Sequence, residues 1–279
     1  MPSTSLSLCW GSMENIALDE HIRCAAAAGF DAVTVSPGSY TEAIQQGYTD
    51  TSIKALLSDN DIRISGFDPV LSWVDGAPEL DGDEHFAIAT RTDISECVRI
   101  ATALDCPLLN LPQGLAEADF DILVKSFANA CDIAAEQNRL VTVEFLPFSK
   151  TNNLATAWQI VEQANRDNGG LMIDLWHFYQ SGGQLADLNT VPMDKIFGIQ
   201  LNGATQCEPK DWIDQTMNAR LQADQGDYDV ATIVQQLTNN GLDIILDVEV
   251  FSATLRALPA EQRAQQCYQA TQNMLNTLG

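Results

Sequence analysis

Residues 140–145 read Leu-Val-Thr-Val-Glu-Phe, an alternation of apolar and polar side chains that is typical of a β-strand. The apolar set can pack against helices, which turns Thr142 and Glu144 to the opposite face. In a closed barrel that opposite face is the lumen. The stretch therefore predicts a barrel strand that brings a carboxylate into the interior near its C-terminal end.

The same kind of stretch recurs along the whole chain, separated by longer segments with the i, i+3, i+4, i+7 spacing of amphipathic helices. Helical spacing is clearest at residues 94–101, 154–161 and 230–237. Strands are expected at Leu6–Trp10, Ala32–Ser36, Arg63–Phe67, Pro107–Leu111, Leu140–Phe145, Leu171–Leu175, Ile196–Leu201 and Ile244–Val250. Strands that alternate with helices in this number predict an α/β protein, a parallel (β/α)8 TIM barrel.

An open, doubly wound parallel sheet is the rival interpretation. That fold would carry a glycine-rich phosphate-binding turn after its first strand, whereas residues 10–15 here read Trp-Gly-Ser-Met-Glu-Asn. No linker or change of composition interrupts residues 1–279, and we therefore expect a single domain.

The composition is that of a globular, strongly acidic protein. Hydrophobic residues make up 46% of the chain, and 38 acidic against 14 basic residues give a net charge of -24. A field of that sign repels phosphate backbones, so nucleic acid is not an expected partner. The seven cysteines include no C-x-x-C pair, and no signal-like or membrane-spanning apolar run occurs. We expect a cytoplasmic protein with free thiols and no membrane partner.

Polar side chains turn inward at the C-terminal ends of four successive expected strands. They are Glu144, Asp174, Gln200 and Glu249, and Asp247 lies one layer deeper on the last strand. Barrel enzymes build their active sites at this end. Carboxylates that converge in a lumen cannot all stay ionised without a bound cation, a basic partner or shared protons. Three carboxylates with one amide favour a hard divalent metal, Mn²⁺ or Mg²⁺, over tight zinc binding.

Four motifs carry a resemblance to a known group of proteins. Val-Glu-Phe-Leu-Pro begins at Val143, and Ile-Asp-Leu-Trp-His, with a D-x-x-H pattern, begins at Ile173. Arg220 precedes Gln-Gly-Asp-Tyr-Asp, and Asp-Val-Glu-Val-Phe ends at Phe251. In this order and spacing they resemble the sugar phosphate isomerase/epimerase branch of the xylose-isomerase-like TIM barrels, which includes the ketohexose 3-epimerases. The resemblance runs through nearly the whole chain.

The resemblance implies roles for individual residues. The metal ligands would be Glu144, Asp174 and Glu249, with Gln200 where the family has a histidine on its seventh strand. Glutamine still offers a neutral carbonyl oxygen to a hard metal. Glu144 and Glu249 would also act as base and acid on opposite faces of a substrate that passes through an enediolate.

Substrate contacts are expected from His177, in the D-x-x-H pattern, and from Arg220. Asp224 and Asp227 offer Arg220 the alternative of a surface ion pair. Three further candidates for substrate contacts lie near strand ends, namely Asn202, Asn110 and Trp10. The tryptophan either forms an apolar wall over a bound ring or only packs within the fold.

Three functions stay open at this point. The first is metal-dependent isomerisation or epimerisation of a sugar, or of a sugar-like polyol or keto compound. A dehydratase or lyase on the same barrel would share the first proton abstraction and then expel a leaving group. A non-catalytic binding barrel that lost its metal with the change to Gln200 is the third. The loops Trp73–Glu84 and Gly203–Gly226 are long enough to cover the mouth of the barrel. Members of the resembling family commonly form homodimers, so a homodimer is a further expectation.

Overall fold

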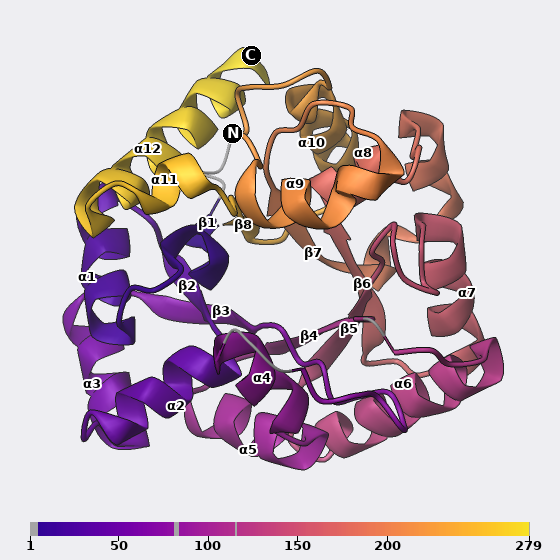
Figure 1. Cartoon of the computed structure of the whole chain (residues 1–279), viewed down its shortest axis with the longest axis horizontal. Helices are drawn as coiled ribbons and strands as arrows, with labels where there is room; N and C mark the ends of the chain where they lie inside the picture. The colour runs from indigo at the N-terminus through magenta and orange to yellow at the C-terminus, as the bar shows by residue number, and fades with distance from the viewer. Residues whose placement is uncertain (1–4, 81–83, 115, 279) are drawn as a thin grey trace.

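The computed structural model describes residues 5–80, 84–114 and 116–278, and its centre is a closed barrel of parallel strands (Figure 1). The strands are β1 (Leu6–Leu8), β2 (Ala32–Val35), β3 (Arg63–Phe67), β4 (Leu108–Pro112), β5 (Leu140–Glu144), β6 (Gly169–Asp174), β7 (Ile196–Leu201) and β8 (Leu246–Val248). Each strand pairs with the next one in the chain, and β8 closes the ring against β1. The predicted (β/α)8 barrel is confirmed.

Helices lie around the barrel and at its mouth (Figure 1). They are α1 (Leu18–Ala28), α2 (Pro37–Gln45), α3 (Asp50–Asp59), α4 (Glu84–Arg91), α5 (Ile94–Ala103), α6 (Phe120–Ala135), α7 (Leu154–Ala164), α8 (Leu175–Gln180), α9 (Trp212–Asn218), α10 (Val230–Asn239), α11 (Ala253–Arg256) and α12 (Ala260–Leu275), with short 3-10 helices between some of them. Side-chain caps mark several starts, as where Asp93 accepts from the Glu96 N–H and begins α5. Within the described ranges, no helix is long and apolar enough to cross a membrane.

The apolar faces of the strands form the core between barrel and helices. Val143, Ile173, Ile199 and Val248, from β5 to β8, are each at most 1% exposed and belong to one hydrophobic cluster. Burial of such side chains is the main favourable term in folding. Because side chains alternate along a strand, the polar neighbours of these residues face the lumen.

Four strands, β1, β2, β5 and β8, are shorter than expected, and β1 and β8 each end two residues early at the mouth of the barrel. β1 stops two residues early because Cys9 begins a 3-10 helix, η1 (Trp10–Met13). β8 also stops two residues early, because the Val250 N–H donates to Ser12 Oγ at 2.8 Å. The two strand ends are thus joined through η1, which carries the first candidate wall residue, Trp10.

The loop that follows β7 is closed on itself at Gly203. The Gly203 N–H donates to Leu221 O at 2.8 Å, and the Leu221 N–H donates back to Gly203 O at 2.9 Å. A Cβ at Gly203 would lie 2.1 Å from Gln225 O and 2.3 Å from Gln222 O, so this backbone approach requires glycine. The Arg220 N–H donates to Phe251 O at 3.0 Å, so the backbone is held at Arg220 as well as at Leu221.

Gly203→Ala is expected to lower the free energy of unfolding by about 1–3 kcal/mol, because the added methyl group forces packed backbone apart. Gly66→Ala on β3 is the matched control, since a Cβ there meets its nearest neighbour only at 3.7 Å. Urea denaturation of both variants measures the difference. Equal stability of the two variants would contradict this account of the loop.

Candidate functional site at the mouth of the barrel

The four strand-end side chains singled out in the sequence come together at the C-terminal mouth. Glu144 ends β5, Asp174 ends β6, Gln200 lies in β7 and Glu249 directly follows β8. All four are at most 5% exposed. Asp174 lies opposite Gln200 in the strand register, so adjacent strands bring their polar groups to one buried cluster.

Arg220 enters this cluster from the loop after β7. Its Nη1 donates to Asp174 Oδ2 at 2.6 Å and to Glu249 Oε2 at 2.8 Å. The residue is 3% exposed, so it does not form the alternative surface ion pair with Asp224 or Asp227. Burial alone would lower the pKa of Arg220, but the facing carboxylates raise it overall. The basic partner that converging carboxylates need is therefore present, although it comes from a loop and not from a strand end.

A cavity of about 350 Å³ opens onto this cluster. The polar groups that line it are Asp68, Glu144, His177, Thr216, Arg220 and Glu249. The remaining lining is mostly apolar, with aromatic rings from Trp10, Phe86, Phe148 and Phe251. Trp10 is therefore part of the cavity wall, and its ring meets Phe251 edge-on at 5.4 Å. The cavity therefore has an apolar wall and a polar floor whose side chains are mostly acidic.

Two buried amides hold the carboxylates in position. Asn110 Nδ2 donates to Glu144 Oε2 at 2.6 Å and to Asp68 Oδ1 at 2.9 Å. Asn202 Nδ2 donates to Asp174 Oδ2 at 3.0 Å. Both amides are fully buried, and neither belongs to the cavity lining. Their contacts favour a positioning role over the substrate contacts expected from the sequence.

His177 lies in the first turn of α8 and lines the same cavity. Its backbone N–H donates to Asp174 Oδ1 at 2.9 Å, which caps the helix. Its Nε2 lies 3.6 Å from Glu144 Oε1 and 3.3 Å from Arg220 Nη2. Burial, with a contribution from Arg220, lowers the pKa of His177 to about 3. A neutral imidazole therefore faces the cavity at neutral pH.

Asp68 belongs to the same cluster, although nothing in the sequence pattern singled it out. It directly follows β3 and accepts from Asn110 Nδ2 at Oδ1 and from Gln200 Nε2 at Oδ2. The available signal was an acidic residue immediately after the third expected strand. β3 reads Arg-Ile-Ser-Gly-Phe, which lacks the clean alternation that fixed the phase of the later strands.

Asp247 lies one layer deeper in the lumen than Glu249. In the strand register it is opposite Gln200 on β7 and Ser7 on β1. Neither of its carboxylate oxygens has a hydrogen-bond partner among the described residues. Burial raises the pKa of Asp247 to about 8, and the charge of Asp68 adds to the effect.

Negative charge exceeds positive charge at this mouth. The buried carboxylates are Asp68, Glu144, Asp174, Asp247 and Glu249. Burial raises the pKa of Glu144 and of Glu249 well above the ordinary value, with neighbouring carboxylates adding to it, and raises that of Asp68 to about 7. Burial would do the same to Asp174, but the charge of Arg220 holds its pKa below the ordinary value. Without a further cation, the other carboxylates tend to keep their protons.

The residues present fit a divalent cation. Ligand atoms of Glu144, Asp174 and His177 lie within 4.8 Å of one another. Gln200 Oε1 is buried and has no hydrogen-bond partner within the described part of the chain. An unsatisfied buried carbonyl oxygen beside an excess of carboxylates is an arrangement that an oxygen-preferring ion would complete. An ion at this place would share Asp174 with Arg220.

The family model described as xylose isomerase-like TIM barrel matches residues 22–274 of this chain. Among solved structures, a crystal structure of the IOLI protein with a bound zinc atom superimposes with a TM-score of 0.85 at 18% identity. That superposition covers 99% of this chain and 99% of the other. At this level of identity the likeness concerns the fold.

Curated relatives include an isomerase and a dehydratase. The inosose isomerase of Bacillus subtilis (strain 168) is 28% identical over 147 residues, which cover 52% of this chain and 52% of that protein. The 3-dehydroshikimate dehydratase of Pseudomonas putida is 24% identical over 249 residues, which cover 88% of this chain and 38% of that protein. The matches thus span 52% and 38% of the relatives' own lengths.

The melting temperature of the metal-free protein is expected to fall as the pH rises from about 5.5 to about 8. Asp68 and Asp247, with pKa values of about 7 and about 8, keep protons in the folded state that the unfolded state has already lost above 3.8. Unfolding therefore releases protons in this range, so a rising pH favours the unfolded state until the two folded carboxyl groups ionise as well. Asp247→Asn should flatten the dependence, because an amide does not ionise.

Melting curves of chelator-treated protein across this pH range make the measurement. Asp59→Asn, at an exposed position on α3, should keep the wild-type slope. An equally steep slope in Asp247→Asn would show that this buried carboxylate does not hold a proton in the fold.

Proposed function

The chain belongs to the xylose isomerase-like TIM barrel family, and from that premise we propose that it is a metal-dependent isomerase or epimerase. Its substrate would be a small sugar, or a sugar-like polyol or keto compound, and its reaction a proton transfer next to a carbonyl through an enediolate. The observation that carries the proposal is that two carboxylates, Glu144 and Glu249, line one cavity from separate strands.

Glu144 and Glu249 are the acid and base of this proposal. They extend from the ends of β5 and β8, which lie on different sides of the ring (Figure 1). A substrate between them would present one face of its reacting carbon to each carboxyl group. Transfer of a proton from one face to the other requires such a pair. Burial raises the pKa of both groups in the metal-free site, and a bound cation would favour their ionised forms.

Arg220 would keep Glu249 in place, and Asn110 would do the same for Glu144. An arginine side chain has five N–H groups that can donate. Here Nη1 donates to the carboxylates of Asp174 and Glu249. Nε donates to Thr216, and Nη2 contacts Thr216 and His177. A substrate oxygen that binds Arg220 would therefore replace one of these contacts. His177 also lines the cavity, and its Nδ1 is buried without a hydrogen-bond partner among the described residues.

We propose that a divalent metal completes the site, with Glu144, Asp174, Gln200 and Glu249 as its ligands. Oxygen donors favour Mn²⁺ or Mg²⁺. When bound, the metal would polarise the substrate carbonyl and stabilise the negative charge that develops on its oxygen. Gln200 would contribute its carbonyl oxygen, which is at present its unsatisfied atom.

The cavity wall favours a substrate with an apolar ring face. Trp10, Phe148 and Phe251 offer aromatic surfaces above the polar floor of the cavity. A cyclic polyol or sugar presents C–H groups on one face and hydroxyl groups at its edge, which suits an apolar wall with a few convergent polar groups. Trp10 is therefore retained as a substrate contact in this proposal.

A dehydratase or lyase is the second candidate, favoured by the match to a 3-dehydroshikimate dehydratase over 88% of this chain. Its reaction would begin with the same proton abstraction by Glu144 or Glu249. The second step would expel a β-hydroxyl group as water instead of returning a proton to carbon. Product mass separates the two candidates, since isomerisation conserves mass and dehydration removes one water.

The remaining proposals concern the setting of the protein. All seven cysteines are unpaired, which is in keeping with the reducing cytoplasm. The net charge of -24 favours a small-molecule substrate over nucleic acid as the partner. We also propose that residues 1–279 form one domain.

Glu144→Gln and Glu249→Gln are each expected to lower kcat by about 10²–10⁴ while the fold is kept, because an amide cannot transfer the proton. Turnover of a small panel of keto sugars and inososes, followed by mass spectrometry, gives the rates and the product masses. Glu162→Gln, at an exposed position on α7, is the control and should keep wild-type turnover. Full activity in both active-site variants, with unchanged circular dichroism, would refute the assignment.

A further inference from the structure

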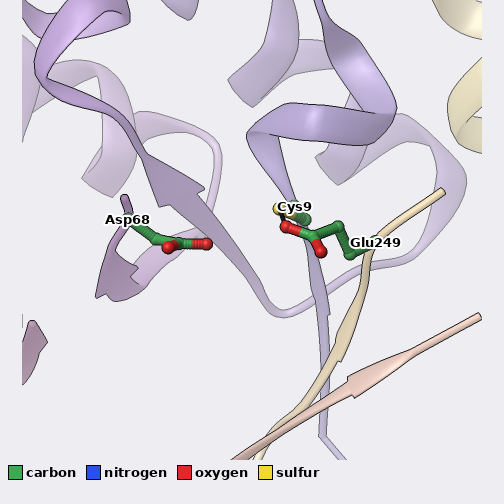
Figure 2. Close-up of side chains that lie close together, drawn as sticks. All are labelled: Cys9, Asp68 and Glu249. Carbon is green, nitrogen blue, oxygen red and sulfur yellow. Dashed lines mark hydrogen bonds between the residues drawn. The ribbon is translucent and has the colours of Figure 1, made fainter. Parts of the chain in front are cut away.

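The polar and apolar residues that line the cavity differ in how far they reach solvent. The polar ones among the described residues form the floor, and each is at most 5% exposed. Figure 2 shows two of them, with the carboxylate of Asp68 pointing toward Glu249 and the thiol of Cys9. The described lining residues that remain partly or fully exposed are all apolar or glycine. Those with side chains form what we call the rim, namely Leu71, Leu80, Phe86, Phe148, Ile213 and Met217.

The rim is an exposed apolar patch that is continuous with the aromatic wall of the cavity. Ile213 on α9 is 55% exposed, whereas the other exposed large apolar residues of the described chain lie between 36% and 39%. Phe86 on α4 and Met217 on α9 pack against the cluster that contains Trp10 and Phe251. An exposed apolar patch at the opening of a cavity indicates a surface that a ligand or partner covers.

A small sugar alone does not account for this arrangement. Bound at the floor between Glu144 and Glu249, it would direct its outer hydroxyl groups to the rim, whose side chains offer no hydrogen-bond donor or acceptor. Polar groups that lose water without gaining a partner weaken binding. A ligand with an apolar outer end avoids this cost and removes the apolar surface of both partners from water.

The charges of the lining do not suit a phosphate group at the outer end. Arg220 is the only arginine or lysine among the described lining residues, and its Nη1 already holds Asp174 and Glu249. It belongs to the floor, where the other charged lining residues are carboxylates. A phosphate at the rim would therefore meet no cation to pair with. An uncharged apolar group matches the rim better.

We propose that the substrate is a sugar or polyol that bears an uncharged apolar substituent, and that the rim binds this substituent. The inference rests on the proposed function for the polar part of the substrate, which lies at the floor beside Glu144 and Glu249. It adds the rim as a subsite that determines specificity. Ile213 and Met217 from α9 and Phe86 from α4 would contact the substituent. Aryl and alkyl glycosides are compounds of this class.

Binding of matched glycosides tests the inference without requiring turnover. The methyl and phenyl β-glycosides of glucose, galactose and xylose differ within each pair only in the outer substituent. Titration calorimetry of the full chain with Mn²⁺ present gives the dissociation constants. We expect the phenyl member of at least one pair to bind about tenfold more tightly or better, because the rim removes the ring from water.

Ile213→Ser should reduce this preference about threefold or more and leave binding of the methyl glycoside unchanged. Ile44→Ser, at an exposed position on α2, is the matched control and should keep the full preference. An undiminished preference in Ile213→Ser would place the phenyl group elsewhere and overturn the inference.

The remaining outcomes separate this inference from its rivals. A smaller preference in every pair, or no binding of any phenyl glycoside, would overturn the inference, and turnover of unsubstituted keto sugars would leave the proposed function intact. Tighter binding of glucose 6-phosphate than of phenyl glucoside would overturn it as well. So would a wild-type dimer that dissociates in Ile213→Ser, since a second copy would then cover the rim. A clear phenyl preference without turnover of any keto sugar would support the rim and refute the proposed function.

Discussion

The guanidinium of Arg220 lies between two buried carboxylates, and the arrangement of the mouth depends on that contact. Nη1 holds Asp174 Oδ2 at 2.6 Å and Glu249 Oε2 at 2.8 Å. Removing such charges from water is unfavourable unless they are paired and fully hydrogen-bonded. The loop after β7, closed at Gly203, brings the guanidinium of Arg220 into the barrel. The ion pairs of this guanidinium in turn fix the orientation of Asp174 and Glu249. Loop conformation and site geometry therefore depend on each other.

One guanidinium does not balance the carboxylates around it. Asp68, Glu144 and Glu249 depend on neutral amide donors and raised pKa values, and Asp247 has no hydrogen-bond donor among the described residues. The same imbalance motivates the proposed metal site. Asp68, with a pKa of about 7, exchanges its proton near neutral pH. A site that is electrostatically unfavourable without a ligand is in this way prepared for one.

The barrel could be predicted because the alternation along most of its strands is a local property, and the expected and observed strand ends differ by at most two residues. The same alternation of inward and outward side chains predicted that Glu144, Asp174, Gln200 and Glu249 lie together. Long-range features could not be found in this way. Arg220 reaches the cluster only through the closure of a loop, and Asp68 follows a strand without alternation. Asn110 and Asn202 face carboxylates because of packing across strands, which strand phase alone does not reveal.

The central claim is that the acidic mouth holds a divalent metal in spite of Gln200. Elemental mass spectrometry of the purified protein, with melting temperatures measured with and without added Mn²⁺, tests it most directly. The account predicts at least near-stoichiometric metal and a melting temperature that rises with Mn²⁺, because a ligand that binds only the folded state stabilises it. Absence of metal together with an unchanged melting temperature would contradict the account. Gln200 would then mark a lost metal site, and the chain would be a binding protein on an enzyme fold.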